Sequence, residues 1–270
     1  MSQPEECRLD FMDTNVVLDA LVREGPFHNA IKEFLGRFRY KELKIIPAVM
    51  KELDEVIKRI NNAVASALEE HLVRNPRWIG MDRGDRLEYL GQIRDKLVDD
   101  VIARVNSRDS EIAQGYVEEF VDRALEEYGG RLSLINSEDD LRSVVRSAVS
   151  LAHRLVRENA LTLFDFVTYP KYSRAAAVPR QSQIFRALVT GSGGKRFSSK
   201  GDALIVAQLL TLLEHPPLVA GQCASVRVEF WTRDEELIKR AKRLKGLDLG
   251  ITPRPKFEDL LVRHPRRDDA

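Results

Sequence analysis

Strand patterns stand at both ends of this 270-residue chain and are missing from a long stretch between them. The first part alternates, with a strand expected over 8–12, a helix over 26–38, a strand over 43–46 and a helix over 48–60. Pro47 precedes the last of these, where proline suits the first turn of a helix. This alternation predicts a parallel sheet, because parallel strands need a crossover, usually a helix, between them.

The same alternation returns from about Lys200. The elements expected there are, in order, a helix over 202–213, a strand over 226–230, a helix over 235–244, a short strand over 247–251 and a short helix over 256–262. Neither half has enough strands to bury a sheet by itself. We therefore expect one discontinuous α/β domain made of residues 1–60 and 200–270.

The stretch between the two halves carries helical patterns. Apolar residues recur three or four positions apart over 63–72, 85–105, 110–128 and 138–158, and glycine and proline residues separate these segments. We expect residues 61–199 to form an all-helical insertion that ends in a basic segment.

Composition narrows the class of protein. Lys and Arg number 43 against 42 Asp and Glu, which argues against a protein held to nucleic acid by bulk charge. Cys7 and Cys223 lie far apart without a metal-binding spacing, so neither a zinc site nor a disulfide framework is expected. There is no signal-peptide pattern and no apolar run of about 18 residues, so we expect a soluble cytoplasmic protein that does not bind membranes.

Four acidic residues stand where predicted strands end or the following helices begin. Asp13 follows the first strand and Asp234 a later one, whereas Glu52 lies early in a helix and Asp202 opens another. Ligands of open α/β sheets bind beyond the carboxyl ends of the strands, so all four side chains can meet in one crevice. Taken singly, Asp13 also fits a turn, Glu52 a solvated surface, and the other two helix caps.

Short motifs surround these acids. They read Phe-Met-Asp-Thr-Asn-Val-Val-Leu at 11–18, Ile-Pro-Ala-Val-Met-Lys-Glu-Leu at 46–53, Gly-Asp-Ala-Leu-Ile-Val-Ala at 201–207 and Trp-Thr-Arg-Asp-Glu-Glu-Leu at 231–237. In composition and order they resemble the motifs of PIN-domain nucleases, and Ile-Thr-Pro at 251–253 resembles a common ending of that family. The third acid follows the second by 150 positions, which is similar to PIN-like subfamilies with a large helical insertion.

The resemblance implies a three-layer α/β/α, Rossmann-like parallel sheet and metal-dependent hydrolysis of a phosphodiester. Carboxylates without histidine or cysteine suit Mg²⁺ or Mn²⁺, since both prefer hard oxygen ligands. We assign Asp13, Asp202 and Asp234 as catalytic residues that bind metal directly or through water. Glu52 is a fourth catalytic residue, as a metal ligand or as the group that positions the attacking water.

Two polar residues beside these acids are candidates for orienting them. Asn15 follows Asp13 by two positions, and Thr232 precedes Asp234 by two. We expect them to orient Asp13 and Asp234, because the groups around metal ligands commonly fix the ligands' position. The alternative is a purely structural role for both residues, with Asn15 as a turn former and Thr232 as a strand residue.

Positive charge is concentrated just before the third acidic motif. Residues 166–201 contain no acid and seven basic side chains that we expect to bind nucleic acid, namely Lys171, Arg174, Arg180, Arg186, Lys195, Arg196 and Lys200. Aromatic residues lie among them, and this combination can hold a phosphate backbone and stack unpaired bases. The alternative is a solvated loop whose aromatic rings lie in the core. By contrast, residues 58–165 hold 20 acidic against 16 basic side chains.

The function that we expect is an endoribonuclease dependent on Mg²⁺ or Mn²⁺, with RNA as its main partner. A structure-specific DNA nuclease is one alternative. Another is a non-catalytic module that binds RNA or, through the helical insertion, a protein partner. The presence of all four acids favours the enzyme, because a protein without activity would be free to lose one of them.

Overall fold

The computed structural model describes residues 6–22, 27–39, 42–73, 78–106, 114–131, 135, 137–169, 171, 173–190, 197, 199–216, 223, 225–245 and 249–265. Its helices and strands are, in chain order, β1 (Glu6–Met12), α1 (Thr14–Leu21), α2 (His28–Leu35), β2 (Leu43–Ile45), α3 (Pro47–Val73), η1 (Trp78–Gly80), α4 (Arg83–Asn106), α5 (Gln114–Gly129), α6 (Glu138–Leu163), β3 (Asp165–Phe166), α7 (Arg174–Thr190), α8 (Lys200–Glu214), β4 (Ser225–Trp231), α9 (Glu235–Leu244), η4 (Phe257–Asp259) and β5 (Leu260–Arg263).

The chain divides into two compact units. The α/β unit comprises residues 1–17, 30–53 and 161–270, and the helical unit comprises residues 18–29 and 54–160. The expected insertion ended at residue 199, but the structure groups 161–199 with the sheet. The reason is packing, because β3 pairs with β2 and α7 packs against α8.

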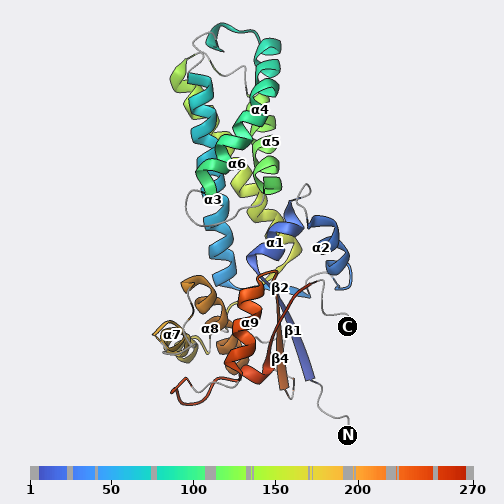
Figure 1. Cartoon of the computed structure of the whole chain (residues 1–270), viewed down its shortest axis with the longest axis vertical. Coiled ribbons are helices and arrows are strands. Elements are labelled where there is room, and N and C mark those ends of the chain that lie inside the picture. Colours follow the sequence, from blue (N-terminus) through green and yellow to red (C-terminus); the bar gives the residue numbers. More distant parts are fainter. Residues whose placement is uncertain are drawn as a thin grey trace. The chain divides into compact units, whose positions relative to one another are not determined.

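The α/β unit is built on a parallel five-stranded sheet with the order β3-β2-β1-β4-β5. The central strands β1 and β4 pair from Glu6 opposite Ser225 to Met12 opposite Trp231, and Figure 1 shows them side by side. Helices α8 and α9 pack against β4 and β5, while Phe34 of α2 stacks on Trp231 with ring centroids 4.8 Å apart. The expected mixed α/β fold with a parallel sheet is confirmed.

Several elements differ from the sequence-based expectation. Residues 256–262 form the short turn η4 and then strand β5 instead of a helix, because Leu260 and Val262 are buried in alternation beside β4. The described part of the expected strand over 247–251, residues 249–251, is not a strand. The sequence reading missed β3 and α7. Finally, α3 is one helix of 27 residues where two helical patterns were expected, with Asn61 buried at their junction.

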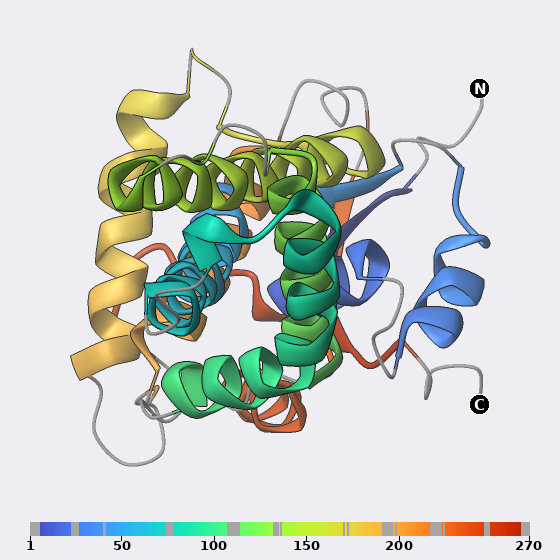
Figure 2. The same cartoon turned by 90° about the horizontal axis from the view of Figure 1, so that it is seen from above.

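The described residues of the helical unit contain helices and no strand, and α3, α4, α5 and α6 gather together in both views (Figures 1 and 2). Arg94 of α4 donates hydrogen bonds of 2.6 and 2.7 Å to Asp122 of α5. The buried ring of Trp78 packs against Tyr89 and Tyr128. None of the helices that the structure describes combines the length and the apolar character that crossing a membrane requires.

Cys7 and Cys223 form a disulfide, so the expectation that they would not pair is wrong. Their Cα atoms are 5.7 Å apart although 216 positions separate them in the sequence. The parallel pairing of β1 and β4 places Cys7 opposite Val226, three positions after Cys223. The sheet topology therefore brings the two thiols together, which spacing in the sequence does not reveal.

Candidate functional site

Asp13 lies at the carboxyl end of the central strand β1 and is buried. Its main-chain N–H donates to the Trp231 carbonyl at 2.9 Å, which continues the pairing of β1 with β4. Its own carbonyl accepts hydrogen bonds from Val16 and Val17 in the first turn of α1. The sheet and a helix start thus fix the main chain of Asp13 from both sides.

Three donors hold the Asp13 carboxylate. Thr14 N–H donates to Oδ1 at 2.8 Å, while Asn15 Nδ2 and Thr232 Oγ1 donate to Oδ2 at 2.8 and 2.5 Å. Burial, followed by the nearby Glu52 carboxylate, nevertheless raises the pKa of Asp13 to about 7, against the lowering effect of the hydrogen bonds. The hydrogen bonds therefore fix the orientation of the Asp13 carboxyl group, while burial and the Glu52 carboxylate disfavour its ionised form.

Glu52 lies in the second turn of α3 and faces Asp13 through Thr14. The Thr14 hydroxyl donates to Glu52 Oε2 at 2.8 Å, and its backbone N–H donates to Asp13. The start of α3 is fastened in turn by Gln208 of α8, whose Oε1 accepts a 2.9 Å hydrogen bond from Ala48 N–H. Thr14 therefore links the two carboxylates, a role that the sequence reading missed although Thr14 lies inside the first motif.

Asp202 lies in the first turn of α8. Its main-chain N–H donates to Ser199 Oγ, the helix cap, at 3.2 Å. Burial is the main cause that raises the pKa of its carboxyl, and the Asp234 carboxylate raises it further. A hydrogen bond with Ser199 and the positive charge of Arg240 act in the opposite direction. Neither Ser199 nor Arg240 belonged to the motifs, so sequence reasoning gave no signal for them.

Asp234 caps the N-terminus of α9. Its Oδ1 accepts hydrogen bonds from the main-chain N–H groups of Glu236 and Leu237 at 2.8 and 3.0 Å. The Asp234 N–H donates at 2.9 Å to Thr232 Oγ1, the same hydroxyl that donates to Asp13. Asp234 therefore has the structural role of a cap, and it is also tied to the Asp13 carboxylate through Thr232.

The four carboxylates are linked electrostatically in sequence rather than all to one another. Glu52 and Asp202 both raise the pKa of Asp13, and Asp234 raises that of Asp202. Side chains from the ends of β1 and β4 and from the starts of α3 and α8 thus lie at the same edge of the sheet. In the part of the chain that the structure describes, however, no group of three or more His, Cys, Asp or Glu side chains is spaced to hold a metal ion.

The donors of the candidate site are of the type that a hard divalent cation prefers. All four acidic side chains offer carboxylate oxygens, which Mg²⁺ and Mn²⁺ prefer. Burial and the Glu52 and Asp202 carboxylates raise the pKa of Asp13, and no basic side chain of the described residues is among the groups that act on it. The site matches such an ion in donor type and charge, but the side chains as they lie do not surround one position where the ion could bind.

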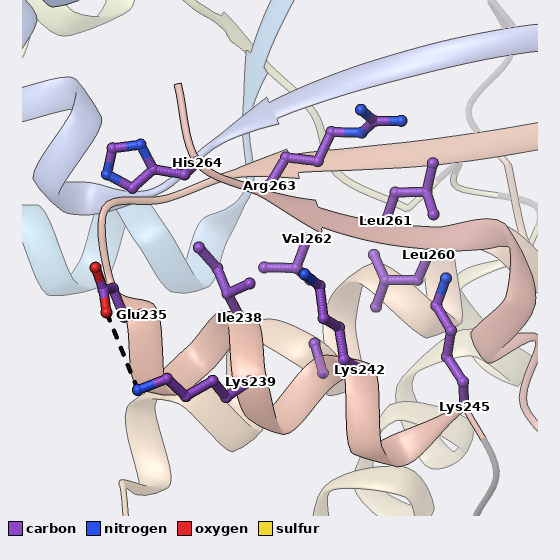
Figure 3. A pocket seen from close by; sticks show the side chains of 11 residues that line it. Glu235, Ile238, Lys239, Lys242, Lys245, Leu260, Leu261, Val262, Arg263 and His264 are labelled. Carbon is purple, nitrogen blue, oxygen red and sulfur yellow. Dashed lines mark ion pairs between the residues drawn. The ribbon is translucent and has the colours of Figure 1, made fainter. Parts of the chain in front are cut away.

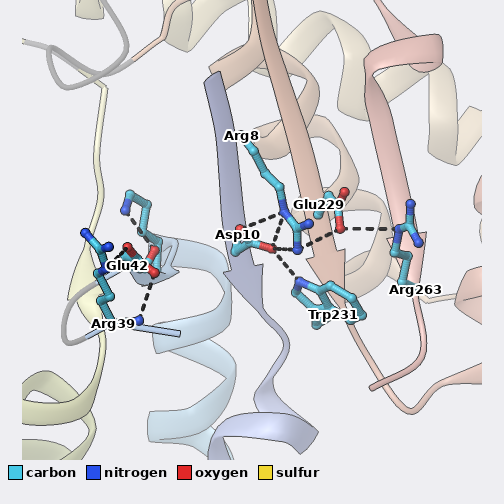
Figure 4. A network of polar contacts seen from close by, with 8 residues as sticks. Arg8, Asp10, Arg39, Glu42, Glu229, Trp231 and Arg263 are labelled. Atoms are coloured by element: carbon cyan, nitrogen blue, oxygen red, sulfur yellow. Dashed lines mark hydrogen bonds and ion pairs between the residues drawn. The ribbon is translucent and has the colours of Figure 1, made fainter. Parts of the chain in front are cut away.

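A second group of acids in the same sheet is compensated within the chain (Figure 4). Asp10 accepts hydrogen bonds from Arg8 and, at 2.8 Å, from Trp231 Nε1. Glu229 pairs with Arg8 at 3.1 Å and with Arg263 at 3.3 Å. These buried acids therefore serve the pairing of β1, β4 and β5.

The basic residues expected to bind nucleic acid have different environments. Arg180 is buried in α7 and makes two 2.7 Å hydrogen bonds to Glu214 of α8, so its charge is used inside the protein. The side chains of Lys171, Arg174, Arg186 and Lys200 are exposed. Lys195 and Arg196 lie outside the described residues.

The aromatic residues of the same segment lie partly in the interior. Phe197 is buried, with the guanidinium carbon of Arg240 5.9 Å from its ring centre. Tyr169 is partly buried and donates to Gln181 Oε1 at 2.6 Å. Both rings therefore match the core interpretation of this segment better than a platform for stacking bases.

In comparisons with protein-family models, with curated proteins and with solved structures, no match to this chain was found.

Proposed function

We propose that this protein is a metal-dependent nuclease, and specifically an endoribonuclease of the PIN-like type. The observation that carries the proposal is the position of Asp13, Glu52, Asp202 and Asp234 at the carboxyl edge of a parallel sheet, where Glu52 and Asp202 raise the pKa of Asp13 and Asp234 raises that of Asp202. Ligands of open α/β sheets bind at this edge. The order of the four motifs along the chain supports the PIN-like assignment and a Rossmann-like arrangement.

In this proposal the four carboxylates hold Mg²⁺ or Mn²⁺. A cation would offset the repulsion that Glu52 and Asp202 exert on Asp13, which is about 4 kcal/mol for two unit charges 4 Å apart at an effective dielectric constant of 20. When bound, such an ion lowers the pKa of a water molecule and stabilises charge on phosphate oxygens.

The residues around the acids position them for this task. Thr232 and Asn15 donate to the same oxygen of Asp13, and Arg233 N–H donates to Asn15 Oδ1 at 3.1 Å, which fixes the amide. Thr14 fixes Glu52 in the same way. In Asp234 both helix N–H groups bind Oδ1, and no hydrogen bond within the described part of the chain uses Oδ2, which is the oxygen suited to an external ligand.

A basic group that acts on Asp202, and a second at the start of the same helix, suit a phosphodiester substrate. Arg240 acts electrostatically on Asp202, and Lys200 is exposed two positions before it. A positive group beside a carboxylate site can hold a phosphate that the acids alone would repel. We therefore infer that the phosphate backbone approaches from the start of α8.

The test is cleavage of RNA and DNA oligonucleotides of identical sequence, labelled at one end, by the full-length protein. We expect internal cleavage of the RNA with Mn²⁺ or Mg²⁺ and none with EDTA. Cleavage of the DNA alone would replace the ribonuclease by the DNA nuclease. Absence of cleavage of either substrate with both metals, or full cleavage in EDTA, would overturn the proposal.

A further inference from the structure

A groove runs between helix α9 and the terminal strand β5 (Figure 3), and its lining begins at Glu235, the residue after Asp234. It encloses a cavity of about 420 Å³. Its floor is aliphatic, since Ile238 of α9 and Leu260 and Val262 of β5 point toward one another. A cavity with such a floor suits apolar side chains of a ligand.

The rim of the groove is basic. Lys239, Lys242 and Lys245 follow one another at three-residue intervals along α9. Lys239 pairs with Glu236 at 3.1 Å and with Glu235 at 4.0 Å. No ion pair of the described residues involves Lys242 or Lys245, so their charges remain for an acidic ligand.

The edge of β5 offers main-chain groups beside this rim. β5 is the last strand of the described sheet, and Arg263 accepts a 2.9 Å hydrogen bond from Thr232 N–H on the β4 side. Main-chain groups of successive residues in an extended strand point to opposite edges, so the N–H and C=O of Val262 point away from β4. Residues from both faces of β5, including Leu261 and Arg263, line the groove, which places it along this edge.

We propose that the groove binds an extended, acidic peptide segment of a partner protein, which adds to the sheet as a strand beside β5. Main-chain hydrogen bonds to Val262 would give affinity, and apolar side chains on the face of the added strand that points toward α9 would enter the aliphatic floor. Acidic side chains on that same face, two positions away along the peptide, would meet Lys242 and Lys245. Among the described residues that line the groove there is no Phe, Tyr or Trp, so it lacks the large rings on which the bases of a single-stranded nucleic acid stack.

The probe is a fluorescein-labelled peptide, Gly-Glu-Thr-Val-Thr-Glu-Thr-Gly, which carries its acids and its valine on one face of a strand and is titrated with the full-length protein by fluorescence anisotropy. We expect binding that weakens at least about tenfold when Lys242→Glu and Lys245→Glu are combined. The matched control combines Lys32→Glu and Lys96→Glu, which change two exposed lysines outside α9 and leave binding unchanged. A Kd weaker than about 1 mM for the wild-type protein would overturn the proposal.

Two further probes separate strand addition from simple charge attraction without altering the protein. The same peptide N-methylated at its central residues loses main-chain donors but keeps its charge, and we expect it to bind at least about tenfold more weakly. Equal binding of the methylated peptide would overturn strand addition. Displacement of the peptide by a single-stranded oligonucleotide, with loss of oligonucleotide binding in the Lys242→Glu, Lys245→Glu protein, would assign the groove to nucleic acid instead. These outcomes do not depend on nuclease activity.

Discussion

Two groups of acidic side chains in the same sheet differ in how their charge is balanced. Asp10 and Glu229 lie within the central strands, and Arg8 and Arg263 compensate them. Around Asp13, just beyond the end of β1, the donors are two hydroxyl- or amide-bearing side chains and one main-chain N–H. The acids that serve the fold are thus paired with arginines, whereas the side chains and main-chain group that donate to Asp13 are all uncharged.

The two groups of acids are expected to have different partners, namely arginines of the same chain for the first group and an external cation for the second. Replacing a compensated acid disturbs the pairing of strands, whereas replacing an uncompensated one removes repulsion together with a ligand for an external cation. The first kind of acid also includes Glu214, which Arg180 pairs with. Function and stability should therefore separate experimentally between the two groups.

The largest effect is expected for Asp202→Asn. The change keeps the shape of the side chain but removes a charge from the carboxylate site, so Mn²⁺-dependent RNA cleavage should fall about a thousandfold, which is about 4 kcal/mol in activation free energy. The melting temperature without metal should stay equal or rise, because repulsion with Asp13 and Asp234 is relieved. Asp99→Asn, on the exposed face of α4, is the control and should change neither quantity. Full cleavage by Asp202→Asn would exclude the site.

Arg180→Ala tests a compensated acid, Glu214. The substitution leaves the Glu214 carboxylate largely buried without its partner, so the free energy of unfolding in urea should fall by about 3 kcal/mol. Arg186→Ala, on the exposed side of the same helix, should change it by less than about 0.5 kcal/mol. Equal effects of the two substitutions would mean that the Arg180 pair is not part of the core.

The sequence predicted the location of the acids better than that of the basic surface. Asp13, Glu52, Asp202 and Asp234 lie at strand ends and helix starts, and a parallel sheet carries such positions to one edge whatever the loops between them do. The contacts of Thr14 and Arg240 with the acids could not be predicted from the sequence, because they depend on how α3 and α9 pack. Topology is thus easier to read from a sequence than side-chain contacts are.

A run of basic residues, by contrast, does not predict a surface. Residues 174–190 form helix α7, which turns successive side chains around its axis, so that Arg180 points inward while Arg174 and Arg186 are exposed. The disulfide and β5 were missed for a related reason. Both depend on which strands become neighbours, and neither Cys7–Cys223 spacing nor the pattern of 256–262 contains that information.

The pH dependence of stability offers a smaller but more specific test of the uncompensated group. The pKa of Asp13 is raised to about 7 in the folded protein from its ordinary value of 3.8, so the folded state holds the proton more tightly. The stabilisation is complete below pH 3.8 and is lost as the pH rises through about 7. In EDTA, raising the pH from about 5 to about 7 should cost the wild-type protein about 2 kcal/mol more than Asp13→Asn, measured by urea unfolding. Parallel pH profiles would contradict a buried, uncompensated Asp13.

The smallest effect concerns the exposed basic residues of the α/β unit. Combining Arg174→Ala, Arg186→Ala and Lys200→Ala removes three charges from α7 and the start of α8, so single-stranded RNA should bind about tenfold more weakly at low salt. The slope of log affinity against log salt should fall by about 2, since each lost phosphate contact contributes about 0.7. Binding is measured by anisotropy in the Asp202→Asn background, which prevents cleavage.

The control for that experiment is a second triple variant, Lys58→Ala, Lys96→Ala and Arg154→Ala, which removes the same charge from exposed positions of the helical unit. If RNA responds only to net charge, the two variants lose equal affinity and equal slope. A loss confined to the first variant means that the phosphates contact the side of the protein where the chain enters α8. Such a result would assign the exposed basic residues and the motif acids to one substrate-binding region, since Lys200 and Asp202 both lie in the first turn of α8.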